Sequence, residues 1–379
     1  MNKKILITGG AGFIGTALSL TLISKGYKVR VLDNLSEKIH GNTPNKSYLF
    51  NLIKDKVEFI KGDVLNKKDW LKALQGQQIV IHLAAETGTG QSMYEIEKYT
   101  DVNIKGTSIF LDILANQKNQ TVEKIIIASS RSIYGEGKYQ CVQHGIVYPT
   151  ERKERDMLKK DFNVKCPICN TNVSLLATDE TSKIHPSSIY GLTKQVQEEM
   201  CMIAGKSFNI PVVAYRYQNV YGPGQSLSNP YTGILSIFST RIKNNNEINI
   251  FEDGKESRDF VYIQDVVDAT ILGIEKDEAN YNIYNVGSGI QTTVIDVIRN
   301  LNKEYRTNVN YTISGNFRLG DIRDNYADLS KIKVELGFKP KVSFEQGIKF
   351  FCQWVSNQEI ENDKFSESFE EMKNKGLLK

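Results

Sequence analysis

The stretch Lys4-Ile-Leu-Ile-Thr-Gly-Gly-Ala-Gly-Phe-Ile-Gly15 decides the fold of this chain. A short apolar run that ends in glycines is typical of a buried parallel strand. The glycines fit G-x-G-x-x-G from Gly10 or G-x-x-G-x-x-G from Gly9, and an apolar helical pattern follows them. Either spacing predicts a strand that turns tightly into a helix, whose free N–H groups and dipole face a pyrophosphate.

A second strand, 28–32, ends at Asp33, about 20 residues beyond the glycines. A carboxylate at this position accepts hydrogen bonds from the ribose hydroxyls of an adenosine and repels a 2′-phosphate. The pair of motifs therefore predicts NAD rather than NADP as the cofactor. The competing interpretation is a glycine turn and a helix-capping aspartate without a ligand.

Further strands and helices alternate along the first half of the chain. The apolar runs predict strands at 57–60, 79–85, 124–128 and 211–216, with helices near 66–75, 99–117 and 189–206. This alternation predicts an α/β fold with a doubly wound parallel sheet, in which ligands bind beyond the carboxyl ends of the strands. Small and polar residues follow several of these ends, namely Asp33, Asp63, Ala84, Ala85 and Ser130.

Residues 136–178 interrupt the alternation with a polar segment that carries two metal-binding patterns. Cys141-Val-Gln-His144 and Cys166-Pro-Ile-Cys169 match the ligand spacing of a zinc ribbon. The competing interpretation is a chance grouping of cysteines and histidines. A closed set of four ligands predicts a structural rather than a catalytic zinc ion, which would order a segment too polar to fold alone.

The second half of the chain has shorter and less regular elements. We expect a helix near 232–244, strands at 247–251, 258–263 and 284–287, and helices near 264–275 and 293–304. The predicted organisation is a cofactor-binding domain over 1–217, with 136–178 inserted, and a smaller substrate-binding lobe over 218–357. Parts near 258–286 return to the first domain. A polar tail, with at most a surface helix, covers 358–379.

The composition excludes several function classes. The 379 residues carry 48 basic and 44 acidic side chains, a net charge of +4 that argues against nucleic-acid or membrane-surface binding. No apolar run reaches the ~18 residues of a membrane span, and the apolar run after Lys4 stops at Thr8, too early for a secretion signal. Five cysteines, an odd number, do not suggest a disulfide framework. We expect a cytoplasmic protein.

Ser188-Ile-Tyr-Gly-Leu-Thr-Lys194 places Tyr190 and Lys194 on one face of a predicted helix. A free tyrosine titrates near pH ~10. A cation nearby favours the phenolate and lowers that value, so the pair is a candidate acid–base device. The competing interpretation is an ordinary solvated pair on a helix surface.

The motifs together resemble the extended short-chain dehydrogenase/reductases, and within them the nucleotide-sugar epimerases and dehydratases. The resemblance covers nearly the whole chain except the cysteine-bearing insertion and the tail. It rests on motifs that occur in the family's order: Thr8-Gly-x-x-Gly-x-x-Gly15, Asp33-Asn34, Gly62-Asp-Val64, His82-Leu-Ala-Ala85, Asn103-x-Lys-Gly-Thr107, Ser129-Ser, Tyr134-Gly135, Tyr190-x-x-x-Lys194, Arg216-Tyr, Asn219-Val-Tyr-Gly-Pro223, Arg258-Asp-Phe260 and Gly320-Asp-Ile-Arg323.

The resemblance implies roles for individual residues. Ser130 would hydrogen-bond the sugar hydroxyl that is oxidised, Tyr190 would be the base, and Lys194 would hold the nicotinamide ribose and lower the pKa of the tyrosine. The implied cofactor-binding residues are Gly9, Gly12, Phe13, Ile14, Gly15, Asp33, Asn34, Asp63, Val64, Leu83, Ala84, Ala85, Asn103, Tyr190, Lys194 and Tyr217. The implied substrate-binding residues are Glu86, Thr87, Ser130, Arg131, Asn219, Gln225, Arg258 and Arg323, of which Asn219 and the last two arginines would bind the nucleotide diphosphate.

One departure from the family narrows the reaction. The 4,6-dehydratases carry an Asp-Glu pair after the catalytic threonine, and this chain has Arg131 and Ser132 there. Dehydration is therefore not expected. Ser129-Ser-Arg-Ser-Ile-Tyr-Gly135 and Tyr217-Gln-Asn-Val-Tyr-Gly-Pro-Gly-Gln-Ser-Leu-Ser-Asn-Pro-Tyr-Thr-Gly233 look most like a subgroup of dTDP-L-rhamnose 4-epimerases.

The expected activity is a redox-neutral inversion at C4 of a nucleoside-diphosphate sugar, best matched by dTDP-L-rhamnose and dTDP-6-deoxy-L-talose. The alternatives are a reductase of 4-keto sugars, an epimerase acting at C2, and a non-catalytic sensor of NAD or nucleotide sugars. The resemblance also implies a homodimer.

Overall fold

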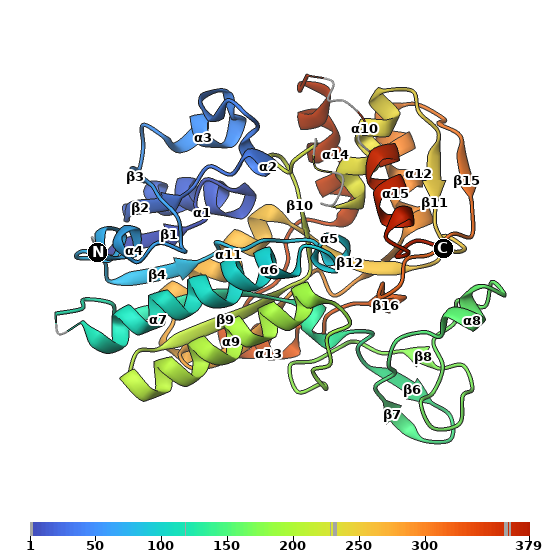
Figure 1. Ribbon diagram of the computed structural model, residues 1–379, viewed down its shortest axis with the longest axis horizontal. Coiled ribbons are helices and arrows are strands. Elements are labelled where there is room, and N and C mark those ends of the chain that lie inside the picture. Colours follow the sequence, from blue (N-terminus) through green and yellow to red (C-terminus); the bar gives the residue numbers. More distant parts are fainter. Residues whose placement is uncertain (1–2, 118, 228, 230–232, 360–362, 364) are drawn as a thin grey trace.

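The protein is built around a seven-stranded parallel sheet of order β13-β9-β5-β4-β1-β2-β3 (Figure 1). The computed structural model describes residues 3–117, 119–227, 229, 233–359, 363 and 365–379. The strands are β1 (Lys4–Thr8), β2 (Lys28–Asp33), β3 (Glu58–Lys61), β4 (Ile79–His82), β5 (Lys124–Ser130), β9 (Val212–Tyr217) and β13 (Asn282–Val286). All of their pairings are parallel, so the predicted α/β fold with a doubly wound sheet is confirmed.

Helices cover both faces of this sheet, which explains why its strands read as continuous apolar runs. One face packs against α1 (Phe13–Ser24), α3 (Tyr48–Ile53), α11 (Ile263–Glu275) and α13 (Ser330–Leu336). The other face packs against α4 (Lys67–Leu74), α7 (Gly106–Asn116) and α9 (Ile189–Phe208). No helix in the described part of the chain is long and apolar enough to span a membrane.

The second lobe has its own core and lies at the upper right of Figure 1. Its helices are α10 (Ile234–Lys243), α12 (Val294–Tyr305) and α14 (Phe344–Ser356). Its strands are β10 (Asn219–Tyr221), β11 (Ile248–Ile250), β12 (Ser257–Tyr262), β14 (Gln291–Thr293), β15 (Tyr311–Ile313) and β16 (Asp324–Asn325). Between β12 and β14 the chain returns to the main sheet through α11 and β13, so the two lobes are interleaved.

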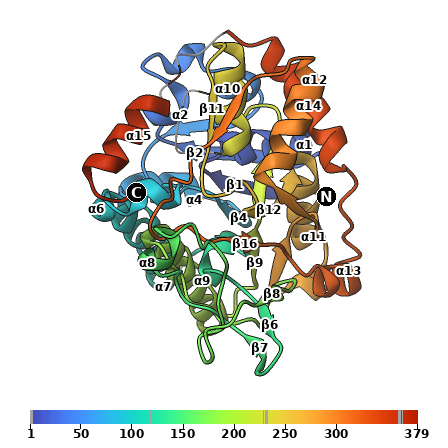
Figure 2. The ribbon, with the colours of Figure 1, turned by 90° about the vertical axis from the view of Figure 1, so that its right-hand side faces the viewer.

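The insertion forms a small unit whose strands extend below the rest of the molecule in both views (Figures 1 and 2). It contains a three-stranded sheet of β6 (Tyr139–Cys141), β7 (Gly145–Val147) and β8 (Ser174–Leu175), and the short helix α8 (Glu154–Met157). Its two ends meet, because the Leu176 N–H donates to the Lys138 carbonyl at 2.9 Å. Lys138 also forms an ion pair with Asp179.

The C-terminal segment is more firmly attached than its polar sequence indicates. Helix α15 (Phe365–Asn374) packs its two phenylalanine rings against Phe251 of the second lobe. Beyond it, Phe317 and Lys379 exchange two backbone hydrogen bonds of 3.0 Å. The apolar side chains of this segment, Met372 and Leu378, are buried. The tail is therefore part of the packed structure rather than a surface appendage.

Several elements are shorter or more irregular than predicted. The expected strand 79–85 ends at His82, since the Leu83 and Ala84 N–H groups turn to Thr8. The expected helix 99–117 begins with π-helical turns, η2 (Thr100–Lys105), before α7. The remaining elements are α2 (Glu37–His40), η1 (Pro44–Lys46), α5 (Thr89–Ser92), α6 (Ile96–Tyr99), η3 (Arg131–Tyr134) and η4 (Asp277–Ala279).

Candidate active site

The glycine turn between β1 and α1 admits no side chain at two positions. Gly9 has φ +66°, and a Cβ there would lie 2.8 Å from the Ala84 backbone nitrogen. A Cβ on Gly15 would lie 2.4 Å from the Gly9 carbonyl oxygen. Helix α1 starts after Gly12 without a side-chain cap. Its first N–H groups are thus available to an anion brought close to the turn, as a dinucleotide pyrophosphate requires.

Asp33 stands at the end of β2 and is held against this turn. Its Oδ2 accepts from the Ala11 N–H at 2.9 Å, and its Oδ1 accepts from the Leu35 N–H at 2.8 Å. Burial raises the pKa of Asp33, and these two N–H groups and His40 oppose the rise. A carboxylate has about four acceptor positions. Asp33 therefore keeps acceptor capacity for ribose hydroxyls while its orientation is fixed.

The other predicted cofactor residues surround the same end of the sheet. Asn34 donates to Asp63 Oδ2 at 3.1 Å, which joins the ends of β2 and β3. The Tyr217 hydroxyl pairs with Thr270 at 2.7 Å, and Tyr217 also lines the cavity that contains Ser130 and Tyr190. The remaining predicted cofactor residues lie in or beside the glycine turn or just beyond the ends of β3 and β4. They are Gly12, Phe13, Ile14, Val64, Leu83, Ala84 and Ala85.

Asn103, predicted to bind the cofactor, makes three hydrogen bonds within the protein. Its Nδ2 donates to the Glu86 carbonyl at 3.1 Å and to Thr193 Oγ1 at 2.9 Å, while its Oδ1 accepts from the Glu86 N–H at 2.8 Å. Both amide hydrogens are thereby used, and the side chain is fully buried. Asn103 thus fixes the loop after β4 to helix α9. A direct contact with the cofactor, as we expected from the sequence, is not what this geometry favours.

Ser130 and Tyr190 come together because α9 begins directly against the end of β5. A Cβ on Gly191 would lie 2.6 Å from the Ser132 carbonyl oxygen, so glycine permits this approach. Ser188 caps α9 by accepting from the Gly191 N–H at 3.1 Å. The Tyr190 N–H donates to Ser92 Oγ at 3.0 Å. The local sequence therefore fixes the start of the helix that carries the tyrosine.

The charge that acts on the Tyr190 phenol is that of Arg131. Burial raises the pKa of Tyr190 above its usual value, and the hydrogen bond with Ser130 and the Arg131 guanidinium oppose the rise. The Lys194 side chain points toward Gln197 in the next turn of α9, and its ammonium group donates to Gln197 Oε1 at 2.7 Å. Burial lowers the pKa of Lys194 to about 8. In this geometry Arg131 rather than Lys194 is the cation that acts on the phenol, and the role expected of Lys194 stays a prediction.

Ser130, Arg131 and Tyr190 line one cavity of about 220 Å³. Arg131 Nε donates to Asn219 Oδ1 at 2.8 Å, which orients the guanidinium from the neighbouring strand β10. Burial lowers the pKa of Arg131 to about 9, so it stays cationic at neutral pH. The full lining is Thr87, Gly88, Thr89, Ser130, Arg131, Ser132, Tyr190, Tyr217, Gln218, Asn219, Val220, Tyr221, Gln225, Gly233, Ile234, Leu235 and Phe260.

Two glutamine side chains at this cavity carry unsatisfied amide atoms. Both amide atoms of Gln218 and Oε1 of Gln225 are buried without a hydrogen-bond partner among the described residues. Buried amides of this kind are usually paired, so a bound polar ligand is a natural partner. Gln225 was expected from the sequence. Gln218 was missed, because no spacing rule distinguishes it from its neighbours.

The residues predicted to bind substrate occupy different environments. Thr87 lines the cavity, whereas Glu86 pairs with Lys38 at 3.2 Å. Arg258 donates to three backbone carbonyls at 2.8 Å, those of Ser257, Ile322 and Arg323. Its guanidinium acts on Arg131 through space.

Arg323, predicted to bind the nucleotide diphosphate, forms ion pairs within the protein. It lies 2.7 Å from Glu252 and 2.7 Å from Asp253 in a largely buried ion-pair network. Its charge is compensated there, so the geometry does not favour a direct contact with a diphosphate.

The predicted metal ligands cluster within the insertion. Cys141 Sγ lies 3.6 Å from His144 Nδ1 and 3.7 Å from Cys169 Sγ, and Cys166 Sγ lies 3.6 Å from the same nitrogen. Ligands of a tetrahedral zinc ion, at bonds of ~2.3 Å to sulfur and ~2.0 Å to nitrogen, lie roughly 3.3–3.8 Å apart. All four ligand atoms lie within 4.8 Å of one another. The set therefore fits a tetrahedral metal ion with four protein ligands.

Comparisons with known proteins agree with this geometry. A model of the NAD dependent epimerase/dehydratase family matches residues 5–152 and 172–287. The chain is 37% identical over 358 residues to dTDP-L-rhamnose 4-epimerase of Burkholderia thailandensis, covering 94% of this chain and 96% of that protein.

Solved structures are also similar. UDP-glucose 4-epimerase of Thermotoga maritima with UDP-glucose has a TM-score of 0.74 at 29% identity, over 93% of this chain and 98% of the other. UDP-glucuronic acid 4-epimerase of Bacillus cereus with UDP-glucuronic acid and NAD has a TM-score of 0.74 at 28% identity, over 93% and 99%.

Proposed function

Because the chain belongs to the NAD-dependent epimerase/dehydratase family, we propose that it inverts C4 of a nucleoside-diphosphate 6-deoxyhexose through a transient 4-keto sugar. One observation carries the proposal. Ser130, Tyr190 and a cation, Arg131, line one cavity, and the position after the catalytic serine holds that cation rather than the acid that dehydration would need.

Tyr190 is the proposed acid–base group of this reaction. Its phenolate takes the proton of the C4 hydroxyl, which Ser130 positions by hydrogen bonding. NAD bound at the glycine turn would accept the C4 hydrogen with its electron pair and later return it to the opposite face of the same carbon. Tyr190 gives the proton back to the C4 oxygen when the C4–H bond forms again. No atom or electron is gained or lost over the cycle, so the product is an isomer of the substrate.

The residues around the glycine turn support NAD as a tightly held cofactor. Gly9, Gly12 and Gly15 permit the tight turn that leads into α1, where a pyrophosphate would bind, and Asp33 would bind the adenosine ribose. Lys194, one turn from Tyr190 on α9, would hold the nicotinamide ribose. A cofactor regenerated in every cycle has no reason to leave, so we expect NAD to copurify.

The sugar nucleotide is a finer part of the proposal. The relative from Burkholderia thailandensis supports dTDP-L-rhamnose and dTDP-6-deoxy-L-talose as the first pair to test. Arg131 and Arg258 would interact with the anionic portion of the substrate. Gln218 and Gln225, with their unpaired amide atoms, would bind sugar hydroxyls.

We also propose zinc as the ion held by the Cys3His cluster, with a structural role, since three thiolates and one imidazole leave no open coordination position. We also propose a homodimer, and two exposed apolar side chains, Leu192 and Ile203, lie on the same face of α9. Light scattering in solution tests the dimer, and elemental analysis of the purified protein tests the metal.

The reaction is tested by NMR of the products formed from dTDP-, UDP-, GDP- and CDP-sugars without added cofactor. Conversion of one substrate to its C4 epimer, with no change in absorbance at the nicotinamide band, supports the proposal. Steady consumption of added NADH would instead establish a 4-keto-sugar reductase. Inversion at C2 would instead identify an epimerase that acts at C2. Bound nucleotide sugar without turnover would establish a sensor.

A further inference from the structure

The insertion is docked onto the second lobe as well as joined to the first. Met157 and Phe162 of the insertion form a buried apolar cluster with Phe317 of the second lobe. The Phe162 and Phe317 rings meet edge to face with centroids 6.4 Å apart. Lys160 Nζ donates to the Gly315 carbonyl at 2.9 Å. The surface that holds the insertion is therefore the segment just before residues 318–325.

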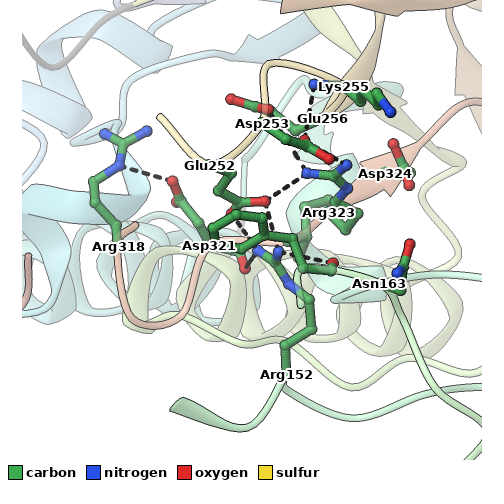
Figure 3. A network of polar contacts seen from close by, with 12 residues as sticks. Arg152, Asn163, Glu252, Asp253, Lys255, Glu256, Arg318, Asp321, Arg323 and Asp324 are labelled. Atoms are coloured by element: carbon green, nitrogen blue, oxygen red, sulfur yellow. Dashed lines mark hydrogen bonds and ion pairs between the residues drawn. The ribbon is translucent and has the colours of Figure 1, made fainter. Parts of the chain in front are cut away.

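At the centre of this contact, Arg152 of the insertion enters a buried ion-pair network (Figure 3). Its two terminal nitrogens donate to the two Glu252 carboxylate oxygens at 2.7 and 2.8 Å. Nη2 also donates to the Asp321 carbonyl at 3.0 Å. Arg152 is 4% exposed and Glu252 is 5% exposed, so this fork contact is shielded from water.

Glu252 connects Arg152 to the segment that follows Asp321. Its Oε2 also accepts from Arg323 Nη1 at 2.7 Å, which places two guanidinium groups on one carboxylate. The Arg323 backbone N–H donates to Glu136 Oε2 at 2.8 Å, and Glu136 lies at the start of the insertion. The Arg323 side chain is thus held by Glu252, which binds Arg152 of the insertion. Its backbone N–H is held by Glu136, which itself belongs to the insertion.

Arg258 takes its orientation from this held segment. Its guanidinium donates to the carbonyls of Ile322 and Arg323, each at 2.8 Å. A guanidinium on backbone carbonyls keeps its full charge, unlike one on a carboxylate, and its direction follows the peptide groups that it contacts. The order of contacts is therefore Arg152 to Glu252, Glu252 to Arg323, and the backbone of 322–323 to Arg258.

A buried ion pair of this kind is weak evidence for stability, because desolvation offsets much of the attraction. Its geometric effect is clearer, since a fork contact fixes both partners. We propose that Arg152 is a positioning residue, through which the folded insertion fixes Arg258 for the diphosphate of the nucleotide sugar. This inference rests on the proposed function, because it assumes that Arg258 binds that diphosphate.

The test compares Arg152→Met and Arg152→Lys with Arg155→Met in the full-length protein. Arg155 lies in the same insertion, and its side chain is 70% exposed. Calorimetry with dTDP and UDP measures the diphosphate site, and titration with NAD measures the glycine turn. We expect Arg152→Met to weaken nucleotide binding on the order of tenfold, the size of one charge-assisted contact. NAD binding should stay unchanged, and Arg155→Met should match the parent protein.

Arg152→Lys keeps the buried charge but not the fork, so it should fold and bind the nucleotide with intermediate affinity. If Arg152→Met does not fold, the nucleotide affinity of Arg152→Lys tests the inference on its own. Unchanged nucleotide affinity in both variants would overturn the inference, as would an equal loss of NAD binding. If the parent protein binds none of the nucleoside diphosphates, the proposed function fails instead. With an identified substrate, KM should rise in the variants while kcat changes little.

Discussion

Arg131 donates from Nε to the amide oxygen of Asn219 at 2.8 Å, and this contact holds a cation beside the Tyr190 phenol. Asn219 belongs to a strand of the second lobe, whereas Arg131 and Tyr190 belong to the cofactor domain. The protonation of the proposed base therefore depends on a contact between the two lobes.

We expect Arg131→Gln to move the rising limb of the pH–rate profile to higher pH. The base is active when deprotonated, so the rate rises with pH through the Tyr190 pKa. Arg131 lowers that pKa, so removing the cation raises it and shifts the rising limb to higher pH. The measurement is kcat between pH 6 and 10, with Arg155→Gln as the surface control. A limb that stays in place would contradict the role of Arg131.

Tyr190→Phe should lower kcat by about a thousandfold, because removal of a general acid–base group typically costs 10²–10⁴ in rate. Binding of NAD and of nucleotide should persist, since the phenyl ring can keep its edge contact with Tyr99. Tyr48→Phe is the matched control, at a half-exposed tyrosine that does not line the cavity. Turnover in Tyr190→Phe close to that of the parent protein would require another base.

Gly9→Ala should abolish tight NAD binding and lower the melting temperature. The new methyl group would lie 2.8 Å from the Ala84 nitrogen, in a backbone conformation of φ +66°. Gly26→Ala separates the two effects, since Gly26 has φ +86° with nothing within 4 Å of the added atom. The control should lose only the ~1–2 kcal/mol of left-handed strain. NAD content after purification and melting curves measure both outcomes.

Loss of the metal should weaken nucleotide binding before it unfolds the main core. Cys166→Ser removes one ligand of the cluster, whereas Cys352→Ser changes a buried free cysteine outside it. We expect bound metal to fall from one ion per chain to near zero only in the first variant. KM for the sugar nucleotide should rise there, with NAD binding retained. Metal retained in Cys166→Ser would argue against the four-ligand site.

The stability of the protein should fall as the pH rises from about 5 to 8, partly through Glu256. Burial and the nearby Glu252 raise the pKa of Glu256 to about 7. A raised carboxyl pKa means that folding favours the neutral form. Its stabilising contribution is complete below the unfolded pKa of about 4.5 and is lost as the pH passes 7.

Glu256→Gln keeps the shape of the side chain and stays neutral throughout. We expect this variant to remove part of the pH dependence, worth about 2 kcal/mol at pH 8. Denaturant unfolding of both proteins at pH 5 and pH 8 gives the comparison. An equal loss of stability in the two proteins would show that other groups dominate.

The sequence predicted the main sheet well, because its strands are buried on both faces and their apolar runs leave little ambiguity. The predicted strands at 28–32 and 211–216 correspond to Lys28–Asp33 and Val212–Tyr217. The glycine turn and the metal ligands were also found, since both depend on short local spacings. The three strands of the insertion were not predicted, because segments of two or three residues carry no periodic signal.

The contacts at the site that the sequence did not predict share one physical cause. Asn103 meets Glu86 and Thr193, and Arg323 meets Glu252, across separations of 17 to 90 residues. No local pattern distinguishes an arginine that faces a ligand from one already paired with a distant carboxylate. Lys194 was assigned its effect on Tyr190 from helical spacing and from the family resemblance. The rotamer of a long side chain decides which neighbour it reaches, and spacing does not fix that rotamer.

The meeting of the two ends of the insertion has a consequence for engineering. The Lys138 carbonyl accepts from the Leu176 N–H, and Thr178 Oγ1 accepts from the Lys138 N–H at 3.2 Å, so the insertion leaves and rejoins the chain at one point. Exchanging residues 139–175 at this neck should leave β5 and α9 in place. The same neck is a natural crossover point for chimaeras between members of this family.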